Sequence, residues 1–251
     1  MSRVVAIVQA RMGSERLPGK VLMPVMGRPL LWYLLNQLKQ AKRLEGIVIA
    51  TSNQVRDDAI EEFGAGAGVH VVRGSERDVL DRFHCAAAEA KADYIVRITA
   101  DCPLICPTVV DGTIENHFAS GCDYTMNDVP GCFPRGYDAE VFSRVVLERT
   151  HVKARRLADR EHVTYYIYTH TEEFSVNTYR DASFPRFPTD RICVDTQEDF
   201  VVVKSIIENV YREKQCMHYG KVLDFLQKNP SVAALNADVK QKTLTARELE
   251  T

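Results

Sequence analysis

Short apolar runs alternate with amphipathic segments along the first half of the chain. The apolar runs are typical of buried strands, which we expect at residues 4–9, 47–51, 69–72, 94–98 and 123–126. A helix is expected to open at Pro29, because the leucines that follow it have helical spacing at positions 31, 34, 35 and 38. Further helices are expected at residues 55–63, 79–90 and 108–118.

Strands that alternate with helices at this pace predict right-handed βαβ units. The expected fold class is therefore α/β, with a mostly parallel Rossmann-like sheet and helices on both faces. In such sheets, ligands bind beyond the carboxyl ends of the strands. The loops at 11–20, after Thr51, at 73–78 and at 99–107 then share one rim, and all four carry polar or charged residues.

The alternation breaks between about residues 127 and 190, where glycines and prolines interrupt it. Short extended runs at 141–142 and 174–179 accompany helical patterns at 144–150 and 161–169. We predict a small antiparallel lobe inserted at about 127–190, before a last sheet strand at 192–194 and a long helix at 196–212. Thr196 and Asp199 have capping-box spacing at the start of that helix. A single domain would cover residues 1–235, and residues 236–251 would form a peripheral C-terminal tail.

The composition of the 251 residues is that of an ordinary globular protein, with 45% hydrophobic and 26% charged residues. A net charge of -2 argues against a nucleic-acid binder. No apolar run approaches the roughly 20 residues that cross a bilayer, and no secretory signal is evident. The seven cysteines lack zinc or C-x-x-C spacing and are expected to be reduced. We therefore expect a cytoplasmic protein that binds neither nucleic acid nor membrane.

The loop at residues 9–20 carries the most informative chemistry. It follows a buried strand and holds two glycines and three cations, a combination that suits a polyphosphate. It is not a P-loop, because five residues separate Gly13 from Gly19 and Val21 follows Lys20 where a hydroxyl would be needed. It is not a Rossmann fingerprint either, since no G-x-G-x-x-G is present. Composition alone is equally compatible with a solvated surface loop.

Two acidic residues follow predicted strands directly. Asp101 comes after the strand at 94–98, and Asp195 comes after the one at 192–194. Two such carboxylates can meet over the rim, where Mg²⁺ would take them together with phosphate oxygens. Taken singly, Asp195 could instead cap the next helix and Asp101 could shape a turn before Pro103. The pair favours a magnesium site.

With these residues in place, the chain resembles the cytidylyltransferase family that makes CMP-activated acid sugars. Its best-known members are CMP-Kdo synthetase and acylneuraminate cytidylyltransferase, and the closest branch is the spore coat polysaccharide biosynthesis cytidylyltransferase-like proteins. The matching segments keep the family's order at residues 9–20, 101–103, 136–142, 160–164 and 194–200. The first is highly specific, whereas Asp-Cys-Pro at 101–103 is weak by itself. The tail after Asn229 matches no pattern of the family.

The resemblance implies a GT-A-like fold and transfer of CMP from CTP to an acidic sugar, nonulosonate or Kdo-like, with release of pyrophosphate. The product would serve cell-surface or spore-coat polysaccharide synthesis. Asp101 and Asp195 would hold Mg²⁺, and catalysis would rest on Arg11, Lys20 and Asp101. The implied nucleotide-binding residues are Ala10, Arg11, Gly13, Ser14, Arg16, Lys20, Arg73 and Ser75. The implied acceptor-binding residues are Tyr137, Asp138 and His162.

Alternatives remain open at this point. The same fold could act on a sugar phosphate, an alditol phosphate or a phosphonate, or could be a nucleotide-binding protein without turnover. A glycosyltransferase is less favoured, because Asp101-Cys102-Pro103 lacks the second Asp of an Asp-x-Asp metal motif. His162 could be a surface histidine, and Asp138 a loop cap. The resemblance implies a homodimer, for which the tyrosines at 165, 166 and 168 offer a helix face that could equally be core.

Overall fold

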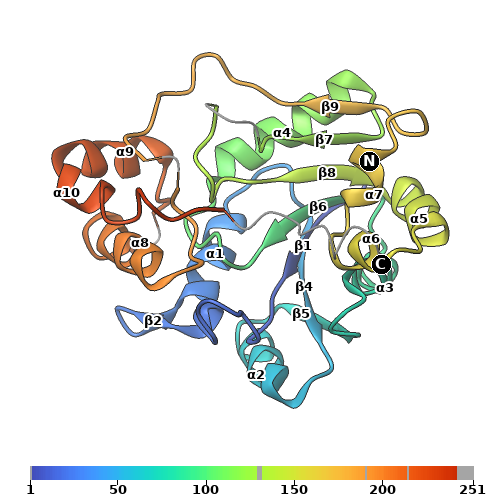
Figure 1. The fold of residues 1–251 in the computed structure, drawn as a ribbon, viewed down its shortest axis with the longest axis horizontal. Coiled ribbons are helices and arrows are strands. Elements are labelled where there is room, and N and C mark those ends of the chain that lie inside the picture. Colours follow the sequence, from blue (N-terminus) through green and yellow to red (C-terminus); the bar gives the residue numbers. More distant parts are fainter. Residues whose placement is uncertain (1, 129–131, 190, 214, 242–251) are drawn as a thin grey trace.

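The computed structural model describes residues 2–128, 132–189, 191–213 and 215–241. Its centre is a seven-stranded sheet with the strand order β5-β4-β1-β6-β8-β7-β9 (Figure 1). The strands are β1 Val4–Gln9, β4 Gly46–Ser52, β5 His70–Gly74, β6 Tyr94–Thr99, β7 Tyr124–Met126, β8 Glu140–Ser143 and β9 Val176–Thr178. A separate two-stranded hairpin pairs β2 Pro24–Val25 with β3 Arg28–Pro29.

The sheet is mostly parallel, as the alternating pattern predicted. Strands β5, β4, β1 and β6 pair in parallel, β8 runs antiparallel to both β6 and β7, and β9 is parallel to β7. The segment expected as an inserted lobe therefore contributes β8 and β9 to the main sheet. This arrangement brings residues of that segment next to the carboxyl end of β6.

Helices cover both faces of the sheet (Figure 1). Along β1, Ala6 and Val8 pack into one core cluster with α1, α2 and α4, whereas Val5 and Ile7 pack into another with α3 and α5. The helices are α1 Leu30–Leu38, α2 Asp58–Gly66, α3 Val79–Glu89, α4 Pro107–Ser120, α5 Arg144–Lys153, α6 Leu157–Glu161, α7 Tyr165–Thr169, α8 Gln197–Val210, α9 Tyr219–Lys228 and α10 Pro230–Ala233, with 3-10 turns η1 Lys20–Leu22 and η2 Val55–Asp57.

Two sequence-based expectations were wrong in detail. Residues 192–194 form no strand of the sheet, because Ile192 and Val194 donate single backbone hydrogen bonds, each 2.8 Å, to the carbonyls of Arg135 and Asp101. Of the helix expected at 161–169, residues 165–169 are helical as α7, whereas α6 ends at Glu161 and the buried Val163 and Thr164 lie between the two helices. The bond from Val194 nonetheless holds the chain segments of Asp101 and Asp195 side by side.

Gly136 is required because its turn passes very close to the backbone of Ile192 and Cys193. Its φ is +113°, and an added Cβ would lie 2.8 Å from the carbonyl carbon of Ile192. We expect Gly136→Ala to lower the free energy of unfolding by about 2–3 kcal/mol, since backbone strain and overlap add. Gly121→Ala is the control, because Gly121 has φ +64° but no atom within 4 Å, and it should cost about 1 kcal/mol. Urea unfolding measures both, and equal losses would contradict the close approach.

Candidate functional site

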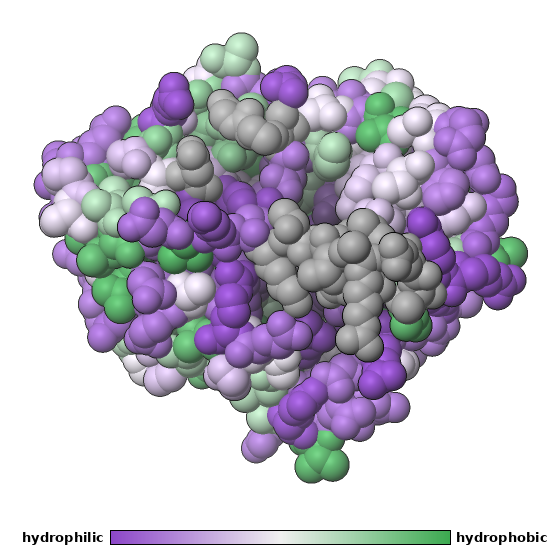
Figure 2. Space-filling model, in the orientation of Figure 1, coloured by the Kyte–Doolittle hydropathy of each residue, from purple (hydrophilic) through white to green (hydrophobic). Residues whose placement is uncertain are grey.

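A cleft opens at the carboxyl ends of β1 and β6. It comprises two pockets, of about 290 and 520 Å³, that we call the small and the large pocket. Figure 2 shows mainly hydrophilic residues around the hollowed middle of this face. Because the pockets share a set of lining residues, the cleft is continuous. The shared residues are Arg11, Arg16, Thr99, Asp101, Glu161 and Asp195.

Lys20 lies at the base of the small pocket, where it begins the turn η1. The preceding Gly19 has a left-handed φ of 73° and donates its N–H to the carbonyl of Met12 at 2.8 Å, which folds the loop back. The Lys20 ammonium then donates to Asp195 Oδ1 at 2.8 Å, Asp101 Oδ2 at 3.0 Å and the Val194 carbonyl at 2.6 Å. One cation thus joins both acidic residues that the sequence singled out.

The ionisation of this cluster follows from its charges. Burial would raise the pKa of Asp101, but the Lys20 ammonium and hydrogen bonds from Thr99 and Lys20 outweigh it and lower the pKa to about 2. Burial would likewise lower the pKa of Lys20, yet the two carboxylates raise it above its ordinary value. A cationic Lys20 beside an ionised Asp101 is the state at neutral pH.

The same donor set fits a divalent cation. Asp101 Oδ2 and Asp195 Oδ1 converge on one point, since both lie within 3.0 Å of the Lys20 ammonium nitrogen. Carboxylate oxygens are the ligands that Mg²⁺ prefers. Asp195 is not the N-cap of the following helix. The Thr196 side chain caps α8, in a capping box with Asp199.

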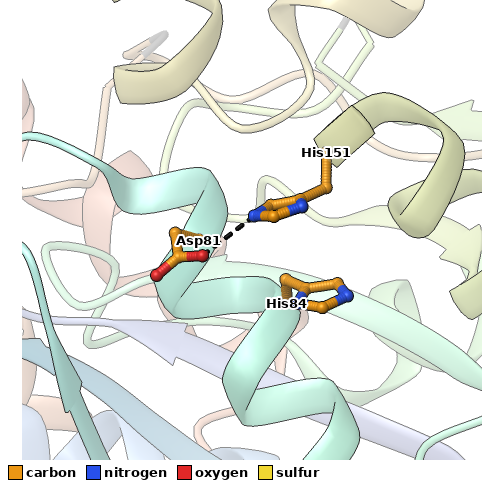
Figure 3. Close-up of side chains that lie close together, drawn as sticks. All are labelled: Asp81, His84 and His151. Carbon is orange, nitrogen blue, oxygen red and sulfur yellow. Dashed lines mark hydrogen bonds and ion pairs between the residues drawn. The ribbon is translucent and has the colours of Figure 1, made fainter. Parts of the chain in front are cut away.

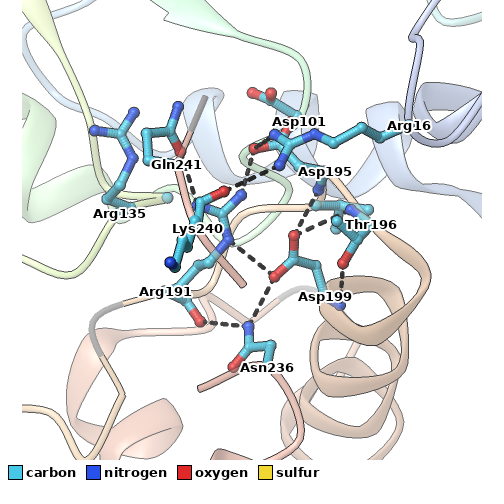
Figure 4. Close-up of polar contacts among 12 residues, drawn as sticks. Arg16, Asp101, Arg135, Arg191, Asp195, Thr196, Asp199, Asn236, Lys240 and Gln241 are labelled. Carbon is cyan, nitrogen blue, oxygen red and sulfur yellow. Dashed lines mark hydrogen bonds and ion pairs between the residues drawn. The ribbon is translucent and has the colours of Figure 1, made fainter. Parts of the chain in front are cut away.

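Charged side chains around Asp195 fix its position (Figure 4). Arg16 lies 2.9 Å from Asp195 Oδ2, and Arg191 contacts the same oxygen. Asp199 is fully buried, accepts from the backbone N–H of Asp195 at 2.9 Å and pairs with Arg191 at 3.0 Å. Since each charge has an opposite partner, the group is held without an unpaired buried ion.

The chain after α10 takes part in this network, although we expected a peripheral tail there. Asn236 donates to Asp199 Oδ1 at 2.9 Å and to the Arg191 carbonyl at 3.1 Å. Gln241 accepts from Arg191 and lines the large pocket, and the carbonyl of Lys240 accepts from Arg16 (Figure 4). Residues 236–241 therefore belong to the site; residues 242–251 lie outside the described residues.

The other residues predicted to bind the nucleotide divide into two groups. Arg11 and Ser14 line the small pocket, and within the described part of the chain Arg11 makes no hydrogen bond or ion pair. The backbone around them is fixed, because the Met12 N–H donates to Asp57 at 2.7 Å. Ala10 is buried beneath the loop, and Gly13 packs against the Arg56 side chain, where a Cβ would lie 2.7 Å from its guanidinium.

Arg73 and Ser75 lie farther along the rim and line neither pocket. Arg73 pairs with Asp58 at 2.7 Å and Glu61 at 2.6 Å and donates to the Ser52 carbonyl. The carbonyl of Ser75 accepts from Arg82 at 2.8 Å. The structure thus places Arg73 in an ion-pair network that joins β5 to α2.

Among the predicted acceptor residues, Asp138 and His162 line the large pocket, but Tyr137 does not. The Tyr137 ring is fully buried and packs edge-on against Phe184 and Phe187. Burial raises the pKa of Asp138 to about 7, even though Arg135 at 3.7 Å opposes the shift. A carboxyl that titrates near neutrality is suited to exchange a proton with a ligand.

Sequence reasoning missed most of the large pocket's polar lining. Arg97 and Glu140 are paired across β6 and β8 and form an ion pair, and Thr164 donates to Glu140 at 2.6 Å. Arg135 also lines the pocket, and its buried Nε finds no partner among the described residues. A signal was available at Arg97, because a cation inside an otherwise apolar strand needs a partner. Others missed are Asp128, Glu161 and Tyr168.

A second polar cluster, Asp81, His84 and His151, lies outside the cleft between α3 and α5 (Figure 3). Asp81 is 2.9 Å from His151 Nε2, and the two imidazoles stack with centroids 4.3 Å apart. Arg160 lies 3.2 Å from the same His151 nitrogen. The nitrogens of two stacked imidazoles do not point toward one position, and the Arg160 guanidinium lies beside the His151 nitrogen that a metal ion would need. We therefore assign this cluster to contact between α3 and α5.

Comparison with known proteins gives three findings. The family model described as cytidylyltransferase matches residues 5–241. The spore coat polysaccharide biosynthesis protein SpsF of Bacillus subtilis is 34% identical, over 93% of this chain and 98% of that protein. A cytidylyltransferase from Leptospira borgpetersenii superimposes with a TM-score of 0.84 and 31% identity, over 98% of this chain and all of that one.

A more distant likeness concerns the fold alone. CMP:2-keto-3-deoxy-manno-octonic acid synthetase complexed with CTP superimposes with a TM-score of 0.62 and 16% identity, over 82% of this chain and 99% of that one. None of the helices in the described ranges has the length and apolar character that crossing a bilayer requires.

The place of the tail in the site can be tested through Asn236, which is 2% exposed. Asn236→Ala removes two donors to buried partners and should lower the free energy of unfolding by about 1–3 kcal/mol. Asn209→Ala, which loses one exposed bond to the Ser205 carbonyl, is the control and should change it by about 0.5 kcal/mol or less. Chemical denaturation compares the two, and matching losses would show that residues 236–241 contribute no buried contacts.

Proposed function

Because the chain belongs to the cytidylyltransferase family, we propose that it transfers CMP from CTP to an acidic sugar, nonulosonate or Kdo-like, with release of pyrophosphate. The observation that carries this proposal is the convergence of Lys20, Asp101 and Asp195 in a cleft with the guanidinium of Arg11. A relative named for spore coat polysaccharide biosynthesis supports a polysaccharide precursor as the acceptor. The product would enter polysaccharide synthesis.

The triphosphate of CTP would lie in the small pocket. Arg11 makes no hydrogen bond or ion pair with a described residue, and Ser14, Arg16 and Lys20 line the same space. Cations that are already in place lower the energy of charge that develops on a leaving pyrophosphate. Asp101 and Asp195 would hold Mg²⁺, which when bound supplies further positive charge to the phosphoryl oxygens.

The acidic sugar would lie in the large pocket. Its lining combines apolar side chains with Arg97, Arg135 and His162 beside Asp138, and these polar groups could bind the hydroxyls and the carboxylate of such a sugar. Arg135 Nε is buried and has no hydrogen-bond partner among the described residues, so it is a donor suited to a carboxylate. The two pockets adjoin along their shared lining residues. An acceptor oxygen and the α-phosphorus can therefore approach each other there.

The chemical step follows from this placement. A hydroxyl oxygen of the sugar attacks the α-phosphorus of CTP, a new phosphorus–oxygen bond forms, and the bond to the bridging oxygen of pyrophosphate breaks. The hydroxyl proton passes to the Asp138 carboxylate, whose pKa of about 7 suits a general base. The protein contributes mainly position and charge, because the reaction needs no covalent intermediate.

The assembly and cellular setting are part of the proposal. Large apolar side chains are exposed on each of the helices α5, α6 and α7, and this part of the surface is our candidate for a contact between subunits. We assign it to a homodimer contact in a cytoplasmic enzyme. The exposed residues are Val145, Val152, Leu157 and Tyr168.

Lys20→Ala should lower kcat by about 10²–10³, because it removes a cation from the site of developing charge. Pyrophosphate release is measured with CTP, UTP, ATP and GTP across acidic sugars, sugar phosphates, alditol phosphates and phosphonates. Arg43→Ala is the control, since Arg43 is an exposed cation paired with Glu115 outside the cleft. Near-normal turnover of Lys20→Ala at saturating Mg²⁺ would defeat the assignment, and preference for another nucleotide or acceptor would revise the substrates.

The role of Asp138 predicts a pH dependence. Only its ionised form can take a proton, so kcat/KM should rise with pH through about 7 and then level off. Asp138→Asn should lack this rise and be slower by about 10²–10⁴ at pH 8. A pH–rate profile of both proteins measures it, and an unchanged rise in the variant would assign the base to another group.

A further inference from the structure

The segment after α10 brings a side-chain amide to the large pocket. Gln241 lines this pocket, and its Oε1 accepts from Arg191 Nη1 at 2.7 Å. Because a guanidinium has only donors, the amide must turn its oxygen toward Arg191. The amide nitrogen therefore points away from Arg191 (Figure 4). It makes no hydrogen bond to a described residue, so its two N–H groups are donors for a ligand.

Arg191 fixes the orientation of this amide. The Arg191 side chain is 7% exposed, and its Nε donates to the fully buried Asp199 at 3.0 Å. The same guanidinium contacts Asp195. Because two carboxylates hold the guanidinium, its hydrogen bond to Gln241 sets the direction of the amide as well as its position.

The backbone that carries Gln241 is anchored at two points. Asn236 is buried and donates to Asp199 Oδ1 at 2.9 Å and to the Arg191 carbonyl at 3.1 Å. The carbonyl of Lys240, the residue before Gln241, accepts from Arg16 at 3.2 Å, and Arg16 lines both pockets. The amide is thus supported by bonded neighbours, as a group that binds a substrate must be.

An anionic acceptor needs more donors than the cations of this pocket leave to it. Of the four arginines that line the large pocket in the described ranges, three already have an acidic partner. The pairs are Arg16 with Asp195, Arg97 with Glu140 and Arg135 with Asp128. The fourth, Arg11, is assigned to the triphosphate. Arg135 still offers its buried Nε, but a carboxylate has two oxygens and lone pairs for several donors.

We propose that Gln241 is an acceptor-binding residue, which donates from Nε2 to the carboxylate of the acidic sugar alongside Arg135. The proposal rests on the proposed function, because it takes an acidic sugar as the ligand of the large pocket. The amide supplies donors that the paired arginines do not, and it carries no charge that would need a partner of its own. The segment after α10 thereby takes part in the choice of acceptor.

Two substitutions of Gln241 separate this role from a structural one. Pyrophosphate release is measured at saturating CTP against the concentration of the acidic sugar with the fastest turnover. Gln241→Ala should raise KM for the sugar about tenfold with little change in kcat, because one hydrogen bond to an anion is lost. Gln241→Glu keeps an oxygen for Arg191 but replaces the donor by a second carboxylate oxygen. It should raise this KM about 10²-fold, because like charges then meet.

Lys240→Ala is the matched control, since it keeps the backbone carbonyl that contacts Arg16 and its side chain lines neither pocket. It should leave KM for the sugar unchanged, and all three variants should keep the KM for CTP. A normal sugar KM in Gln241→Glu would overturn the proposal, because a residue that only supports Arg191, or that meets a sugar hydroxyl, tolerates this change. Absence of turnover with every acidic sugar would instead overturn the proposed function, and the role of Gln241 with it.

Discussion

The Lys20 ammonium, shared between Asp101 and Asp195, is the interaction on which the rest of the site depends. Burying two carboxylates near one another is unfavourable unless a cation lies between them. The lysine supplies that cation from the protein itself and holds the two carboxylate oxygens in a convergent geometry. The same geometry explains why a loop with the composition of a solvated surface is ordered: its last cation is anchored in the interior.

The fold positions the three residues of this contact. Parallel pairing of β1 with β6 brings the end of the 9–20 loop and Asp101 to the same edge of the sheet. Asp195 does not follow a sheet strand, and its position instead depends on the single bond from Val194 to the Asp101 carbonyl and on the buried pair of Arg191 with Asp199. Gly136 permits the close approach of the neighbouring turn. Three unrelated segments are therefore packed to hold two oxygens near one nitrogen.

Much of this could be predicted from sequence, because the strongest signals are local. Apolar runs located β1, β4, β5, β6 and β7 to within a few residues, and five short segments in order along the chain, of which 9–20 is the most specific, indicated the family. The prediction of a strand at 192–194 was wrong. A short apolar run has the same sequence pattern whether it pairs along a neighbouring strand or makes only isolated backbone hydrogen bonds. The tail was misjudged for a related reason: Asn236 and Gln241 are polar residues, and burial of a polar residue depends on distant partners that composition does not reveal.

The lining of the large pocket was the hardest part to predict from sequence. Its charge pairs form only once elements that are distant in sequence pack or pair in a particular register. Arg97 is visible in the sequence as a cation in an apolar strand, but its partner Glu140 is defined only once β8 pairs with β6. Asp78 and Arg160 likewise look like ordinary surface charges until α6 packs beside α3. Each of these charges is held by a residue from another element, and Arg97 with Glu140 forms one connected part of the lining of the large pocket. Substitutions within it should therefore combine non-additively, because removing one partner changes the environment of the next.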